Sequence, residues 1–170
     1  MTDDAIARLA RQIDLAEREQ RFLVNAEDIA ALRRRAAAEL HQVCAQFVTA
    51  LNSKLSATSV DISPALYSPE MFRESGVNLI QIASQGRAMQ IAFEAPRELV
   101  STEKFRVPYI LEGELRAYNQ KMLERFDIRT LLIFFCVEAD TATWRFFDWR
   151  TLRTGPVNGE LLVSLMQPLF

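Results

Sequence analysis

Hydrophobic side chains recur at helical spacing through the first 57 residues of the chain. The first stripe averages 3.4 residues per step (17 positions in five steps) and consists of Ile6, Leu9, Ile13, Ala16, Gln20 and Leu23. This spacing is close to the 3.5-residue period of a coiled-coil seam. It predicts a helix over residues 1–22 whose apolar face packs against another helix.

A second helix is predicted from about residue 25, because Asn25 can act as its N-cap and Val24 and Ile29 can form a hydrophobic staple around the cap. Its stripe averages 3.7 residues per step (26 positions in seven steps) and consists of Ile29, Leu32, Ala36, Leu40, Val43, Phe47, Leu51 and Leu55, widened by Cys44 and Val48. A wide stripe near the period of a straight helix is typical of packing on a sheet. The second helix is therefore predicted to be the main core helix.

After residue 58 the period of the pattern changes to that of strands. Residues 78–84 and 88–94 alternate around Gln85, Gly86 and Arg87, which predicts a hairpin with one solvated face. Residues 107–116 alternate in the same way and predict a third strand. Residues 131–137 and 143–149 are apolar on both faces, with 138–142 as a turn between them, and are predicted to form the centre of the sheet.

Two short segments carry helix signals. Residues 68–76 begin with Ser-Pro and end with Gly, which predicts a helix of one to two turns. In the tail, Leu161 and Leu165 could line either a helix or a strand, but Asn158 supplies an N-cap. A short helix is the favoured interpretation of residues 158–167.

The fold class follows from where glycine and proline lie. All five glycines and all six prolines fall between Pro64 and Pro168, and these residues are excluded from helix interiors. We therefore expect a single α+β domain, with a helical segment at 1–57 and a sheet-forming segment at 58–170. It should contain two N-terminal helices, an antiparallel sheet of about five strands with helices covering one face, and a short C-terminal helix.

Composition excludes several classes of protein. The net charge of −2 argues against a partner bound mainly through phosphate neutralisation. The N-terminus lacks the basic and apolar regions of a secretory signal, and the longest apolar run has seven residues against about 20 for a membrane helix. We expect a cytoplasmic protein with no membrane association. Cys44 and Cys136 form no CxxC motif and are expected to be reduced and buried.

The candidate ligand-binding residues are Glu112, Glu114 and Arg116, which share one face of a strand at spacings of about 7 Å. Paired carboxylates can perform acid–base chemistry or hold a hard cation. The favoured interpretation is simpler: the outer face of the strand is solvated, and Arg116 neutralises Glu114.

The candidate partner surface in the sheet consists of Arg145, Phe147 and Trp149, again on one face of a strand. Interleaved aromatic and arginine side chains can form a protein interface or stack nucleic-acid bases. They can also be core aromatics covered by arginine stems, which is the favoured interpretation.

Other chemical signals are weak. The only basic run, Arg33 to Arg35, fans around a helix and is interpreted as a solvated face rather than an anion site. His41 is the only histidine, and its proximity to Cys44 is interpreted as packing. The chain contains neither GxGxxG nor GxxxxGK[ST]. No catalytic residue, metal site or cofactor is predicted.

Three functions remain open. The favoured one is a non-enzymatic protein that forms a homodimer, or binds another protein, through Ile6, Leu9 and Ile13. The second is an enzyme or small-ligand binder with a pocket between the sheet and the second helix, using Glu112, Glu114 and Arg116. The third is binding of single-stranded nucleic acid through Arg145, Trp149 and Arg150, which the acidic balance disfavours.

Overall fold

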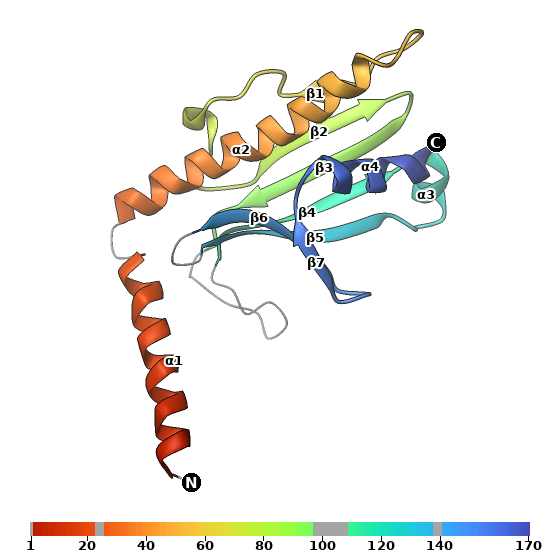
Figure 1. The fold of residues 1–170 in the computed structure, drawn as a ribbon. Coiled ribbons are helices and arrows are strands. Elements are labelled where there is room, and N and C mark those ends of the chain that lie inside the picture. The colour runs from red at the N-terminus through yellow and green to blue at the C-terminus, as the bar shows by residue number, and fades with distance from the viewer. Residues whose placement is uncertain (1, 23–25, 97–108, 138–140) are drawn as a thin grey trace.

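A computed structural model describes residues 2–22, 26–96, 109–137 and 141–170, and has the predicted α+β fold (Figure 1). Two helices, α1 (Thr2–Phe22) and α2 (Ala26–Asn52), precede a seven-stranded antiparallel sheet, and α4 (Gly159–Met166) follows it. The strands are β1 (Asp61–Ser63), β2 (Asn78–Ser84), β3 (Arg87–Glu94), β4 (Tyr109–Tyr118), β5 (Arg129–Val137), β6 (Ala142–Asp148) and β7 (Arg153–Pro156). Short helical turns are η1 (Pro69–Met71), α3 (Gln120–Glu124) and η2 (Gln167–Leu169).

The strand order in the sheet is the order in the chain, β1 to β7, and every neighbouring pair is antiparallel. The two strands beyond the predicted five are the edge strands β1 and β7, of three and four residues, which are too short to show an alternating pattern. The prediction that residues 131–137 and 143–149 form the centre is wrong, because β4 is the middle strand. β5 is apolar on both faces for another reason: its outer face carries a second, small apolar cluster.

The β2–β3 hairpin forms as predicted. Ser84 pairs with Arg87, and the two turn residues between them, Gln85 and Gly86, have φ angles of +52° and +75°. Positive φ at both positions is the signature of a type I′ turn, whose twist matches that of the strands it joins. Arg87 is therefore the first residue of β3 and not part of the turn.

Helix α2 supplies the helical side of the core, as the sequence predicts. It lies along one face of the sheet (Figure 1), which we call the inner face, and α4 contacts α2 on the same side. The fully buried residues of α2 are Ala36, Ala37, Leu40 and Cys44. They pack against inward side chains of the strands, among them Ile80, Ile82, Met89, Ile91, Phe93, Leu111, Leu115, Ile133, Phe135 and Trp144.

Of the two short segments predicted to be helical, one forms a helix and the other forms only a single turn. The tail forms α4 as predicted, and the Asn158 side chain accepts a hydrogen bond from the amide of Leu161 at 3.0 Å. The segment after Ser68 forms only the three-residue turn η1. The next residue, Phe72, is extended and buried in the core, so the chain leaves the helix in order to bury this ring.

Some predicted features fall outside the described residues. They are the cap at Asn25 with its partner Val24, the last stripe residue Leu23, the first two residues of the predicted third strand, and most of the 138–142 turn. The rest of the third strand is β4, which continues to Tyr118.

Candidate functional site

Helix α1 carries an apolar face that the described part of the chain leaves uncovered. Ile6, Leu9 and Ile13 are 62%, 55% and 58% exposed. All described side chains of the helix, residues 3–17, are exposed, and α1 has no extensive contact with any other described element. Figure 1 shows α1 directed away from the sheet. The predicted apolar face thus lies on a helix that has no helical neighbour among the described residues.

The candidate ligand residues lie on the face of the sheet opposite α2, which we call the outer face. Leu115, between Glu114 and Arg116 in β4, is fully buried in the core, whereas these two charged side chains are partly exposed. Arg116 Nη2 lies 2.8 Å from Glu114 Oε2, the neutralising pair that the favoured interpretation predicts. Since Glu112 shares the outer face, the alternative of a pocket between the sheet and the second helix cannot use these three residues.

Strand pairing brings the two predicted sets of sheet residues together. One row across β3, β4, β5 and β6 consists of Glu94, Glu112, Phe134 and Arg145. The next row consists of Ala92, Glu114, Leu132 and Phe147. The candidate ligand residues and the candidate partner residues therefore share one face, separated by a single strand. Sequence spacing alone could not show this, because it depends on the register of strands that are distant in the chain.

A shallow concavity of about 430 Å³ lies on the outer face beside Glu112. Its lining consists of Val77, Ala92, Phe93, Glu94, Tyr109, Glu112, Gly113, Glu114, Leu132 and Phe134. Burial raises the pKa of Tyr109, and the charge of Glu112 and a hydrogen bond to its carboxylate raise it further. Glu94 and Glu112 face each other directly across β3 and β4, an arrangement of like charges that destabilises a sheet. Within the described ranges, no group of three or more His, Cys, Asp or Glu residues is arranged to hold a metal ion.

The structure separates the members of the predicted partner surface. Phe147 is buried on the outer face in a cluster with Tyr109, Phe134 and Cys136. Trp149 lies beyond the end of β6 and is 49% exposed. The guanidinium carbon of Arg150 lies 5.2 Å from the centroid of the Trp149 ring. Phe147 thus acts as a packing residue, and only the Trp149 end of the set presents a large exposed ring.

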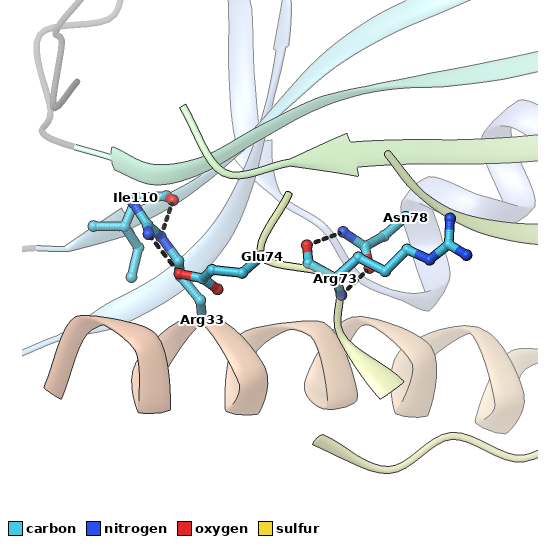
Figure 2. A network of polar contacts seen from close by, with 5 residues as sticks. All are labelled: Arg33, Arg73, Glu74, Asn78 and Ile110. Carbon is cyan, nitrogen blue, oxygen red and sulfur yellow. Dashed lines mark hydrogen bonds and ion pairs between the residues drawn. The ribbon is translucent and has the colours of Figure 1, made fainter. Parts of the chain in front are cut away.

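The basic run on α2 is not uniformly solvated as predicted. Arg34 and Arg35 are exposed, but the Arg33 side chain is only 16% exposed. Arg33 Nε donates to the carbonyl oxygen of Ile110 in β4 at 2.9 Å, and Nη1 contacts Glu74 Oε1 at 2.8 Å (Figure 2). The prediction is wrong for Arg33. This first residue of the run faces the start of β4, and its guanidinium group links the helix to the sheet.

A second polar contact fixes the segment that leads into β2. The side chain of Asn78 accepts a hydrogen bond from the Arg73 amide at 2.8 Å and donates one to the Arg73 carbonyl at 3.1 Å (Figure 2). Its amide nitrogen also lies 3.4 Å from the carbonyl oxygen of Phe93. Asn78 is one of three buried polar or charged residues in the described chain, and these bonds satisfy its amide. Together with Arg33, it holds the 73–78 segment against the sheet.

His41 and Cys44 have the surroundings of packing residues. His41 is buried, its Nε2 lies 2.7 Å from the carbonyl oxygen of Pro64, and its ring stacks on Tyr67 with a centroid distance of 5.3 Å. Burial raises the pKa of the Cys44 thiol to about 12, so the thiol keeps its proton at neutral pH and is a poor nucleophile. As predicted, both cysteines are buried, and in the described part of the chain neither forms a disulfide.

An apolar pocket whose lining residues the sequence did not point to lies at the C-terminal end of α2. Its volume is about 300 Å³, and it is lined by Phe47, Leu51, Leu55, Thr58, Val60, Ser84, Val163, Met166, Gln167 and Phe170. The lining comes from three distant parts of the chain, so spacing could not assemble it. One signal was present: the apolar stripe continues to Leu55, beyond the last residue of α2, Asn52.

Comparison of the chain with protein-family models, curated proteins and solved structures gives no match. In the described part of the chain, no helix combines the length and the hydropathy that a membrane span requires. The features of the molecule that bear on its function are the exposed face of α1, the outer face of the sheet and the apolar pocket.

Proposed function

We propose that the protein is a non-enzymatic, self-associating module in which α1 pairs with α1 of a second copy. The observation that carries this proposal is the exposure of Ile6, Leu9 and Ile13 along one face of a 21-residue helix. Isolated helices are marginally stable in water, and most helices in proteins are stabilised by packing of an amphipathic face. A partner helix would provide that packing.

The order of residue types in the seam supports a second copy as the partner. In heptad notation Ile6 and Ile13 occupy a positions and Leu9 a d position. β-Branched residues at a with Leu at d favour two-stranded parallel coiled coils. The a position at Gln20 is polar, and polar a residues set register and oligomer state at a cost in stability.

The size of the seam predicts a weak dimer. Complete burial of one Ile or Leu side chain contributes about 1.5–3 kcal/mol. Slightly more than half of each side chain is exposed, so six side chains in a dimer contribute roughly 5–10 kcal/mol. This gain is comparable to the lower part of the range for the free-energy cost of association, which is roughly 4–15 kcal/mol. We expect a dissociation constant that is micromolar or higher.

Sedimentation velocity over a concentration series tests the proposal. The wild-type protein should pass from monomer to dimer, and the Ile6→Gln/Ile13→Gln variant should remain monomeric. The matched control is Arg8→Gln/Arg11→Gln, which changes exposed positions off the seam and should dimerise like the wild type. A wild-type protein that is monomeric throughout, or a dimer that persists after deletion of residues 1–22, would contradict pairing through α1.

A further inference from the structure

The apolar pocket has the size and lining of a small-molecule site. It is open on one side between the end of α2, residues 58–60 with the end of β2, and the α4–η2 segment. Its volume of about 300 Å³ is at the lower end of the usual range for ligand pockets, roughly 300–1,000 Å³. Among the residues that the structure describes, no Asp, Glu, Lys or Arg is part of the lining. The pocket therefore favours a compact ligand with an apolar body.

The walls of the pocket suit a single aliphatic chain. Such a chain is narrow and needs no hydrogen bonds along its length, which matches walls made by Phe47, Leu51, Val60 and Met166.

The polar groups of the lining do not favour a polar ligand. The hydroxyl group of Ser84 already donates a hydrogen bond to the carbonyl oxygen of Ser59 at 3.1 Å. The other polar lining residues are Thr58 and Gln167. A ligand rich in hydrogen-bonding groups would lose its water contacts on entering and gain few in return.

A fixed positive charge stands next to one wall. Arg87 Nε donates to the carbonyl oxygen of Leu169 at 3.1 Å, and Nη1 donates to the carbonyl oxygen of Gln85 at 3.0 Å. The guanidinium carbon lies 4.6 Å from the ring centroid of Phe170, which lines the pocket. These contacts hold the guanidinium in place beside the pocket, where it can pair with an anionic group at the end of an apolar ligand.

From this geometry we propose that the pocket binds a medium-length aliphatic carboxylate, with its chain inside the pocket and its carboxylate group paired with Arg87. Chain burial supplies the affinity, and the charge selects an acid over a neutral molecule of the same length. The proposal does not depend on pairing through α1, because no described residue of α1 lines the pocket.

A series of aliphatic carboxylates of increasing length tests whether the aliphatic part of the ligand occupies the pocket. Binding of hexanoate, octanoate, decanoate and dodecanoate to the full chain is measured by isothermal titration calorimetry below their micelle concentrations. Each added methylene should tighten binding about fourfold until the pocket is full, after which the affinity should level off. Absence of saturable binding, or an affinity that keeps rising without levelling as surface adsorption would, overturns the proposal.

Two substitutions test whether the ligand binds in this pocket and whether the charge of Arg87 selects an acid. Val163→Trp fills the pocket from an exposed position of α4 and should weaken decanoate binding at least tenfold, whereas Ser164→Trp, exposed on the same helix outside the lining, should not. Arg87→Gln should remove the preference for decanoate over decanol and leave decanol binding unchanged. Unaltered decanoate binding by Val163→Trp, or an unaltered acid preference in Arg87→Gln, overturns the assignment.

Discussion

The indole nitrogen of Trp144 in β6 donates a hydrogen bond to the carbonyl oxygen of Ala36 in α2, at 2.7 Å. Both residues are buried in the main core. The Trp144 ring also meets Phe93 and Phe135 edge to face, with centroid distances of 5.6 and 5.4 Å. One side chain thus joins the helix to three strands of the sheet through both polar and aromatic contacts.

Trp144→Phe should lower the free energy of unfolding by about 1–3 kcal/mol, because the ring remains while the hydrogen bond and part of the buried volume are lost. Urea denaturation followed by circular dichroism measures the change, with a lower midpoint and an unchanged slope. Trp149→Phe is the matched control: its ring is half exposed, and its effect should stay within about 0.5 kcal/mol. Equal midpoints for the two variants would show that the Trp144 bond does not stabilise the fold.

Gly113→Ala should destabilise the protein by about 1–3 kcal/mol or more. A Cβ atom at this position would overlap the carbonyl oxygen of Ala92 and lie 2.8 Å from Cα of Phe93, so β3 and β4 would have to separate. Gly159→Ala is the control, because a Cβ there meets nothing within 4 Å and alanine favours the first turn of α4. Thermal denaturation should show a lower midpoint for the first variant and an equal or higher one for the second.

Arg33→Lys should cost about 1–2 kcal/mol, although it keeps the charge. A lysine presents one ammonium group and cannot reproduce the separate contacts of Nε with Ile110 and Nη1 with Glu74. Arg34→Lys, at an exposed position of the same helix, should have no measurable effect. Chemical denaturation of both variants measures the difference, and equal stabilities would argue that Arg33 is only a solvated charge.

Stability should fall as the pH rises above about 9. Burial raises the pKa of the Cys44 thiol from 9.0 to about 12, so between these values the unfolded chain has lost a proton that the folded chain keeps. The contribution of this group is complete below about pH 9 and declines by up to about 1.4 kcal/mol per pH unit above it. Burial also raises the pKa values of Tyr67 and Tyr109, which adds a loss of the same sign at higher pH.

Cys44→Ala isolates the thiol contribution. The variant should be less stable than the wild type at neutral pH because it leaves a small cavity, but its stability should decline less steeply between about pH 9 and about pH 11. Denaturant midpoints at several pH values measure the two slopes. Parallel pH profiles for wild type and variant would contradict the raised pKa of Cys44.

Features encoded by neighbouring residues were predictable from the sequence. The β2–β3 hairpin depends on Gly86 and on alternation within two adjacent segments, and α4 depends on Asn158 and a short apolar face. Helix α2 shows its core face through the spacing of residues such as Ala36 and Leu40. In each case the physical cause lies within one element and its turn.

Features that depend on pairing between distant segments were not predictable. The apolar outer positions of β5, Leu132 and Phe134, suggested a central strand, whereas they belong to the small cluster around Tyr109. Tyr109 joins this cluster at a register shift between β4 and β5, an irregularity that leaves no mark on the alternating pattern. Edge strand β1 has a single partly buried side chain, Ile62, and gives no periodic signal.

In the candidate sites too, features within one strand or helix were predictable, whereas features that join distant segments were not. Alternation alone predicted that Glu112, Glu114 and Arg116 share a face and favoured a solvated outer face, but it did not predict that Arg145 lies in the same row as Glu112. Arg33 looked like its neighbours in a basic run, because its partners Ile110 and Glu74 are 77 and 41 residues away. The apolar pocket requires the ends of α2 and α4 to be placed in space before it can be recognised.

The sequential order of the strands has a consequence for synthesis of the protein. Each strand can pair with the one made just before it, but α2 is made before any strand, and the sheet that covers it includes Trp144, 108 residues after Ala36. At translation rates of about 5–20 residues per second, that interval lasts about 5–20 s. The apolar face of α2 is therefore uncovered during elongation, long enough for chaperones that bind hydrophobic segments to reach it before the sheet closes over it.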